Sequence, residues 1–168
     1  EDHAKGHYAA LKARIDQLKR EAEAKGIDTL VLDAGDFSEG SSYFLANQGE
    51  ESWRAMSEMG YDAVVIGNHD YLMGQKDLDR IIGNVKPDFF LLGANFHPKS
   101  QYKALKQAMQ PSVRLERGGM RISIMGLTTD DFIYTWRAEG AIKSPIADAK
   151  KLVPQLSKNS DFVIALTH

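Results

Sequence analysis

The stretch Ala63-Val64-Val65-Ile66-Gly67-Asn68-His69-Asp70 decides the fold expected for this 168-residue chain. Its first four residues are all apolar, as in a strand that is buried on both faces. The next four change abruptly to a glycine, an amide, an imidazole and a carboxylate. In α/β proteins the carboxyl ends of the strands are where ligands bind. The stretch therefore predicts a buried strand that ends in a functional site.

Three further apolar runs also end in polar residues. The runs and their ends are residues 29–32 with Asp36, residues 122–125 with Asp130 and Asp131, and residues 162–166 with His168. Helical patterns separate the runs, and strands that alternate with helices indicate an α/β domain. Because ligand sites form at the carboxyl ends of such strands, we expect Asp36, Asn68 and His168 to lie close together.

Hydrophobic periodicity predicts two helices in the first third of the chain. Residues 8–25 carry their apolar side chains on one helical stripe, which is typical of a surface helix. Residues 37–49 are rich in Gly, Ser and Asn and are expected to form a loop. Asn47 with Glu50 resembles a capping box that begins the next helix. The core residues expected from that helix are Trp53, Met56 and Met59.

Turn and breaker residues organise the rest of the chain. Ser144-Pro145 predicts a helix start, and Pro154 predicts either a kink or an early end of that helix. Its buried face is expected to carry Ile146, Ala149, Val153 and Leu156. The other predicted elements are a helix through residues 78–82, a strand over residues 89–92, a short helix over residues 102–109 and a hairpin turn at Gly118-Gly119.

The composition limits the possible functions. Hydrophobic residues make up 43% of the chain and charged residues 26%, which indicates one globular domain rather than disorder. A net charge of −2 provides no basic surface for nucleic acid. No apolar run approaches the roughly 18 residues that a membrane span needs. The absence of cysteine excludes disulfides, thiolate nucleophiles and Cys-based zinc sites.

The converging side chains suit a metal site. Asp36, Asn68 and His168 offer a carboxylate, an amide oxygen and an imidazole, a mixed set that suits divalent Mn, Zn or Fe. A carboxylate can bridge two ions, and two ions about 3.5–4 Å apart can activate a water and neutralise a phosphoryl oxygen. His69, next to Asn68, would then act as a general acid or as a hydrogen-bond donor to the transition state.

Other polar residues have simpler explanations. Asp33 is expected to brace the turn before Asp36, and Asp130 and Asp131 to form a solvated turn. No role is assigned to the histidines at His3, His7 and His97. Tyr134 and Trp136 are candidates for lining a substrate groove.

Three motifs, taken in their order along the chain, resemble those of the calcineurin-like metallophosphoesterases. The shared motifs are Gly35-Asp36, Gly67-Asn68-His69-Asp70 and Thr167-His168. The 5′-nucleotidase branch is similar over further stretches, namely residues 32–37, residues 59–63 and residues 126–129. The resemblance implies a two-layer β-sandwich flanked by helices. It also implies two divalent metal ions bridged by Asp36, with Asn68 and His168 on one of them and His69 as the catalytic histidine.

The resemblance further implies a substrate and a location. Members of this branch hydrolyse nucleotides and related small phosphate esters, often outside the cytoplasm, and usually carry a separate C-terminal domain that binds the nucleoside. We therefore expect a periplasmic or extracellular protein, although residues 1–7 contain no apolar signal-peptide segment.

Three family features are absent. The first-strand Asp-x-His and the final Gly-His-x-His or Gly-His-x-Gln are missing, so we expect residues 1–168 to be an incomplete catalytic domain that is inactive in isolation. The third feature is an Asp that this branch commonly has three residues after the catalytic histidine. Leu72 occupies that position here, which leaves open how His69 is oriented.

Two alternative functions stay open at this point. A thiosulfate-ester hydrolase on the same fold would keep the metals and change the substrate pocket. A non-catalytic domain would keep the fold and bind metal poorly. The sequence identifies neither the alcohol that carries the phosphate nor the native metal.

Overall fold

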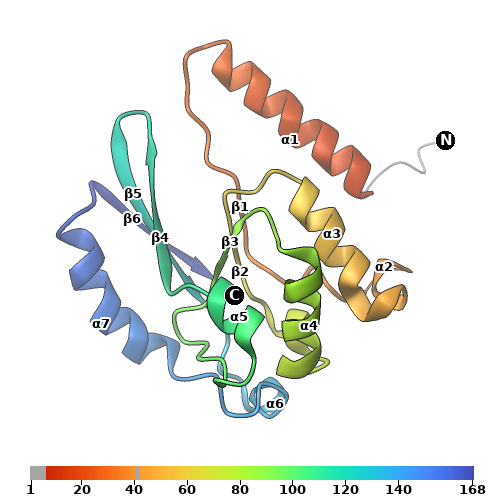
Figure 1. Ribbon diagram of the computed structural model, residues 1–168. Coiled ribbons are helices and arrows are strands. Elements are labelled where there is room, and N and C mark those ends of the chain that lie inside the picture. Colours follow the sequence, from red (N-terminus) through yellow and green to blue (C-terminus); the bar gives the residue numbers. More distant parts are fainter. Residues whose placement is uncertain (1–6, 41) are drawn as a thin grey trace.

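The computed structural model describes residues 7–40 and 42–168, apart from the side chains of residues 132 and 133. Two three-stranded sheets form its centre, and helices flank them (Figure 1). The first sheet has the order β1-β2-β3 and is parallel throughout. Its strands are β1 (Leu32–Asp33), β2 (Ala63–Val65) and β3 (Phe90–Leu92).

The second sheet has the order β4-β5-β6. β4 (Ser112–Arg117) and β5 (Met120–Leu127) form the predicted antiparallel hairpin, and β6 (Phe162–Thr167) pairs parallel to β5. Leu127 is paired with Thr167, so β5 and β6 end side by side. His168 follows directly after that paired end.

The two sheets pack against each other through an apolar layer. It contains Ala63 and Leu92 from the first sheet and Val113, Ile122 and Ile124 from the second. At Gly126 the sheets approach so closely that a Cβ atom would lie 2.5 Å from Leu92 Cβ. This packing forms the two-layer sandwich that the resemblance implies.

Helices cover the outer faces of both sheets (Figure 1). Residues of α3 and α4 pack on the first sheet, and α7 packs on β5 and β6. Trp53, Met56 and Met59 are buried, as predicted. The helices are α1 (Tyr8–Glu23), α2 (Ser42–Leu45), α3 (Glu50–Glu58), α4 (Gln75–Val85), α5 (Lys103–Ala108), α6 (Phe132–Thr135) and α7 (Pro145–Ser157), with 3₁₀ turns η1 (Asn47–Gly49) and η2 (Asn68–Tyr71).

Two predictions near the first strand were wrong. The strand expected over residues 29–32 is reduced to β1, because the Val31 N–H donates to the Asp62 side chain and the Thr29 carbonyl accepts from Arg117. The loop expected over residues 37–49 contains α2 and η1. Gly49, with a φ of 92°, caps α3 in place of Asn47.

α7 also differs in part from its prediction. The Ser144 hydroxyl caps the helix as expected, but the helix continues through Pro154 to Ser157. Its contacts with the sheet come from Ala149, Leu152 and Leu156, which pack against Met125 and Leu127. The predicted face was therefore partly wrong, since Ile146 and Val153 are exposed. Contacts on both sides of Pro154 hold the helix against the sheet.

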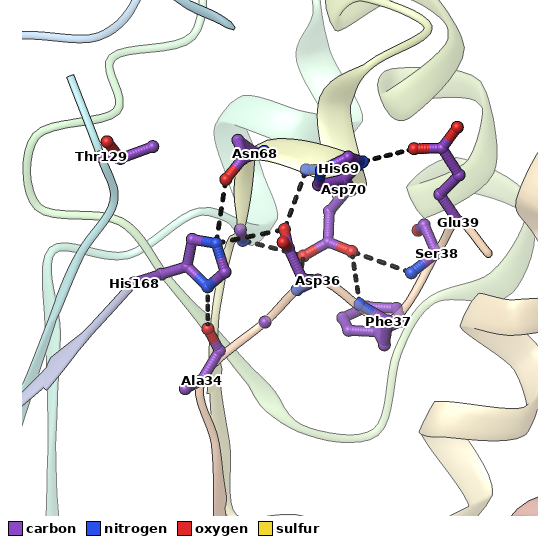
Figure 2. Close-up of polar contacts among 12 residues, drawn as sticks. Ala34, Asp36, Phe37, Ser38, Glu39, Asn68, His69, Asp70, Thr129 and His168 are labelled. Atoms are coloured by element: carbon purple, nitrogen blue, oxygen red, sulfur yellow. Dashed lines mark hydrogen bonds and ion pairs between the residues drawn. The ribbon is translucent and has the colours of Figure 1, made fainter. Parts of the chain in front are cut away.

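The loops after β1 and β2 are joined by one buried side chain, that of Asp70 (Figure 2). Oδ2 accepts hydrogen bonds from the N–H groups of Asp36 (3.0 Å) and Gly67 (2.8 Å). Oδ1 accepts from those of Phe37 (3.1 Å) and Ser38 (3.0 Å). Burial raises the pKa of Asp70 to about 6, although these hydrogen bonds oppose the shift. The carboxylate fixes both loops relative to each other.

We expect Asp70→Asn to lower the free energy of unfolding by about 2–4 kcal/mol. The amide group of asparagine would turn its own donor towards backbone N–H groups, which would then be buried without an acceptor. Urea denaturation measures the change. Asp130→Asn, at an exposed residue, is the control and should stay within about 0.5 kcal/mol of the wild type. Equal stabilities for the two variants would contradict this role.

Candidate functional site

Three strand ends bring Asp36, Asn68 and His168 together (Figure 2). Asp36 lies in the loop after β1, Asn68 begins η2 after β2, and His168 follows β6. His168 Nε2 lies 3.0 Å from Asn68 Oδ1 and 3.2 Å from Asp36 Oδ1. The three side chains thus meet at one edge, with one donor contributed by the second sheet.

The other ring nitrogen of His168 determines what Nε2 can do. Nδ1 lies 2.7 Å from the carbonyl oxygen of Ala34, and a carbonyl can only accept, so Nδ1 carries a proton. Nε2 is therefore the nitrogen that faces Asn68 Oδ1 and Asp36 Oδ1, and it can give its lone pair to a metal ion that lies between these oxygen atoms. Metal-binding histidines commonly have this arrangement, with the second N–H donated to a backbone carbonyl. The donor set therefore fits a divalent cation.

Asp36 has an unusual backbone conformation. Its φ is 65°, in the left-handed region that few non-glycine residues adopt. Its Oδ1 accepts a hydrogen bond of 2.9 Å from the His69 N–H. A Cβ atom on Gly67 would lie 2.3 Å from the same Oδ1, so only glycine fits there. The carboxylate is thus held directly against the loop that carries Asn68 and His69.

The ring of His69 is held by residues from other segments. Its Nδ1 contacts the carboxylate of Glu39, and its centroid lies 5.7 Å from that of Tyr134. The hydrogen bond to Glu39 raises the pKa of His69, and partial burial opposes this. Leu72 offers no acceptor. Glu39 could not be predicted from the sequence, because nothing in the Gly- and Ser-rich loop distinguishes this glutamate from a solvated one.

An open pocket of about 680 Å³ adjoins His69. Asp36 and Glu39 border it on the side of the strand ends. Phe44 and Leu45 of α2 supply apolar surface, and Leu45 is 84% exposed. The pocket can accept an organic group next to the imidazole.

The other polar and aromatic residues considered in the sequence lie outside this cluster of three side chains. Asp33 accepts the Gly35 N–H at 2.9 Å and braces the turn, as predicted. Asp130 and Asp131 are exposed. His97 lies 3.5 Å from Asp148, and Trp136 stacks with Arg137. His3 lies outside the described residues.

The number of donors limits the metal content. Within residues 7–40 and 42–168, no three His, Cys, Asp or Glu side chains gather into a metal-binding group. The cluster contains two such side chains, and the amide of Asn68 provides the third donor. These three donors can hold one ion and part of the coordination shell of a second.

No helix within residues 7–40 and 42–168 is long and apolar enough to cross a membrane.

Comparisons with known proteins agree with this geometry. The family model for calcineurin-like phosphoesterases matches residues 3–168. The 5′-nucleotidase of Vibrio parahaemolyticus is 32% identical over 173 residues, which cover 99% of this chain and 30% of that protein. Protein UshA of Escherichia coli is 31% identical over 172 residues, which cover 97% of this chain and 30% of that protein.

A solved structure agrees as well. The 5′-nucleotidase precursor from Thermus thermophilus aligns with a TM-score of 0.77 and 28% identity, covering 94% of this chain and 31% of that one. The chain thus spans about 30% of the length of the relatives it matches. The match over residues 3–168, and the family motifs at the observed strand ends, show that this chain belongs to the calcineurin-like phosphoesterase family.

Proposed function

We propose that this chain is part of the N-terminal catalytic domain of a metal-dependent phosphoester hydrolase of the 5′-nucleotidase type. The observation that carries the proposal is the meeting of an imidazole nitrogen with an amide oxygen at 3.0 Å and a carboxylate oxygen at 3.2 Å. The relatives named 5′-nucleotidase support a nucleotide as the substrate.

Asp36, Asn68 and His168 would hold the metal ions. Mn, Zn or Fe suits their mixed oxygen and nitrogen donors. Bound as a pair, such ions supply a polarised water and positive charge for the phosphoryl oxygens. Asp36 would supply negative charge to the ions, and Asn68 and His168 would supply neutral donors. The donors that complete the other ion would come from segments outside this chain.

His69 would act on the leaving group. A proton on its ring, directed to the ester oxygen, would stabilise the negative charge that develops as the phosphorus–oxygen bond breaks. The alcohol of the substrate would occupy the pocket between His69 and α2. Recognition of the nucleoside would depend on a further C-terminal domain, and the resemblance favours a location outside the cytoplasm.

We expect His69→Ala to lower kcat strongly for the hydrolysis of p-nitrophenyl phosphate in the presence of Mn²⁺. The protein to test is the chain extended to the length of its relatives. General acid catalysis contributes about 10²–10⁴-fold, so the loss of kcat should fall in that range. His97→Ala replaces a histidine on another surface and should keep the wild-type rate. A normal kcat for His69→Ala would exclude the catalytic role.

Asp36→Asn in the same protein should remove activity and weaken Mn²⁺ binding while preserving the fold. Asparagine tolerates the left-handed backbone and can still accept the His69 N–H, but it lacks the charge that attracts the ions. Isothermal titration with Mn²⁺ and a thermal melt report the two properties separately. Asp130→Asn is the matched control. Unchanged Mn²⁺ affinity would rule out Asp36 as a ligand.

The 168-residue chain alone should fold and yet show no turnover of p-nitrophenyl phosphate with Mn²⁺. Its three donors assemble only one side of a two-ion site. Circular dichroism verifies the fold, and the release of p-nitrophenol measures the rate. Sustained turnover by this chain would mean that it contains a complete site.

A further inference from the structure

We propose that Glu39 is the positioning residue of His69 and that it holds the imidazole from a loop distant in sequence. This assignment rests on the proposed function, in which His69 acts on the leaving group. Glu39 and His69 are thirty residues apart, and their side chains meet through a carboxylate oxygen and Nδ1 (Figure 2).

The contact decides which ring nitrogen is available to a substrate. A carboxylate on Nδ1 requires the proton of that nitrogen to face Glu39, since an ionised carboxylate only accepts. Nε2 is then the nitrogen that remains for the leaving-group oxygen. The backbone of His69 is fixed independently, because its N–H donates to Asp36 Oδ1. Together with the packing of Tyr134 on the ring, these contacts restrict both the position and the rotation of the imidazole.

Local sequence cannot provide this support. His69 lies in the 3₁₀ turn η2, where side chains three residues apart lie on the same side. The residue at that spacing is Leu72, whose side chain cannot accept a hydrogen bond. The acceptor therefore has to come from another segment, and Glu39 is the carboxylate that reaches Nδ1.

Glu39 is itself well placed to hold a fixed position. The preceding residue, Ser38, donates its N–H to Asp70 and accepts a hydrogen bond from the Ser52 hydroxyl through its carbonyl, at 3.0 Å each. The side chains of Glu39 and His69 are each 38% exposed, so the pair lies in the pocket wall and not in the core. Removing the Glu39 carboxylate should therefore change the orientation of the His69 ring and leave the fold intact.

The test compares Glu39→Ala with Glu58→Ala, which removes an exposed glutamate on α3. Both variants are made in the protein extended to the length of its relatives and labelled with ¹⁵N-histidine. In the metal-free wild type, the hydrogen-bonded Nδ1 proton of His69 should give a downfield NMR signal. We expect Glu39→Ala to lose this signal and Glu58→Ala to keep it.

The kinetic readout uses p-nitrophenyl phosphate with Mn²⁺. Glu39→Ala should lower kcat by about 10–100-fold, by analogy with the loss seen when a partner that orients a metal-binding histidine is removed. KM, bound Mn²⁺ and melting temperature should stay at wild-type values. A wild-type kcat, or a loss that appears in KM or metal content, would overturn the assignment.

The two proposals fail in different ways. A wild-type protein that hydrolyses no phosphate ester would overturn the proposed function. The Nδ1 signal would then decide the Glu39 assignment alone, because it is recorded without metal or substrate. A signal that persists in Glu39→Ala would refute the assignment whatever the activity.

Discussion

A single buried carboxylate, that of Asp70, sets the geometry on which the rest of the site depends. Burying a charge is costly unless hydrogen bonds replace its water, and four backbone N–H groups do so here. These donors belong to the two loops that follow neighbouring parallel strands. Because N–H groups of both loops donate to the same carboxylate, the two loops are held together. The positions of Asp36, Glu39, Asn68 and His69 are thereby fixed relative to one another.

The third metal-binding candidate reaches this unit by a different route. His168 arrives at the end of β6, in the second sheet, so its position depends on how the sheets pack. The close approach of Gly126 to Leu92 brings β5 against β3, and β6 is paired with β5. The cluster is therefore built from one local hydrogen-bond network and one long-range packing contact.

The sequence could predict much of this site, because strand ends are encoded locally. Buried apolar runs followed by polar residues were enough to identify Asp36, Asn68 and His168 as neighbours. Glu39 could not be found in this way, since its contact joins two irregular segments that have no periodicity. Likewise, the apolar face of α7 was misassigned at Ile146 and Val153, because the sheet beneath the helix decides which residues are covered. The short β1 reflects competition from the side chains of Asp62 and Arg117 for backbone groups.

The two histidines of this site differ in what keeps their rings in place, and the difference affects how the protein can evolve. His168 is held by the main-chain carbonyl of Ala34, which every amino acid possesses. Residue 34 can therefore be substituted without changing which ring nitrogen of His168 faces Asp36 and Asn68. The ring of His69 instead contacts the carboxylate side chain of Glu39, which a single substitution can remove. The contact at His69 is therefore sensitive to the substitution of one residue, whereas the contact at His168 does not depend on the identity of residue 34.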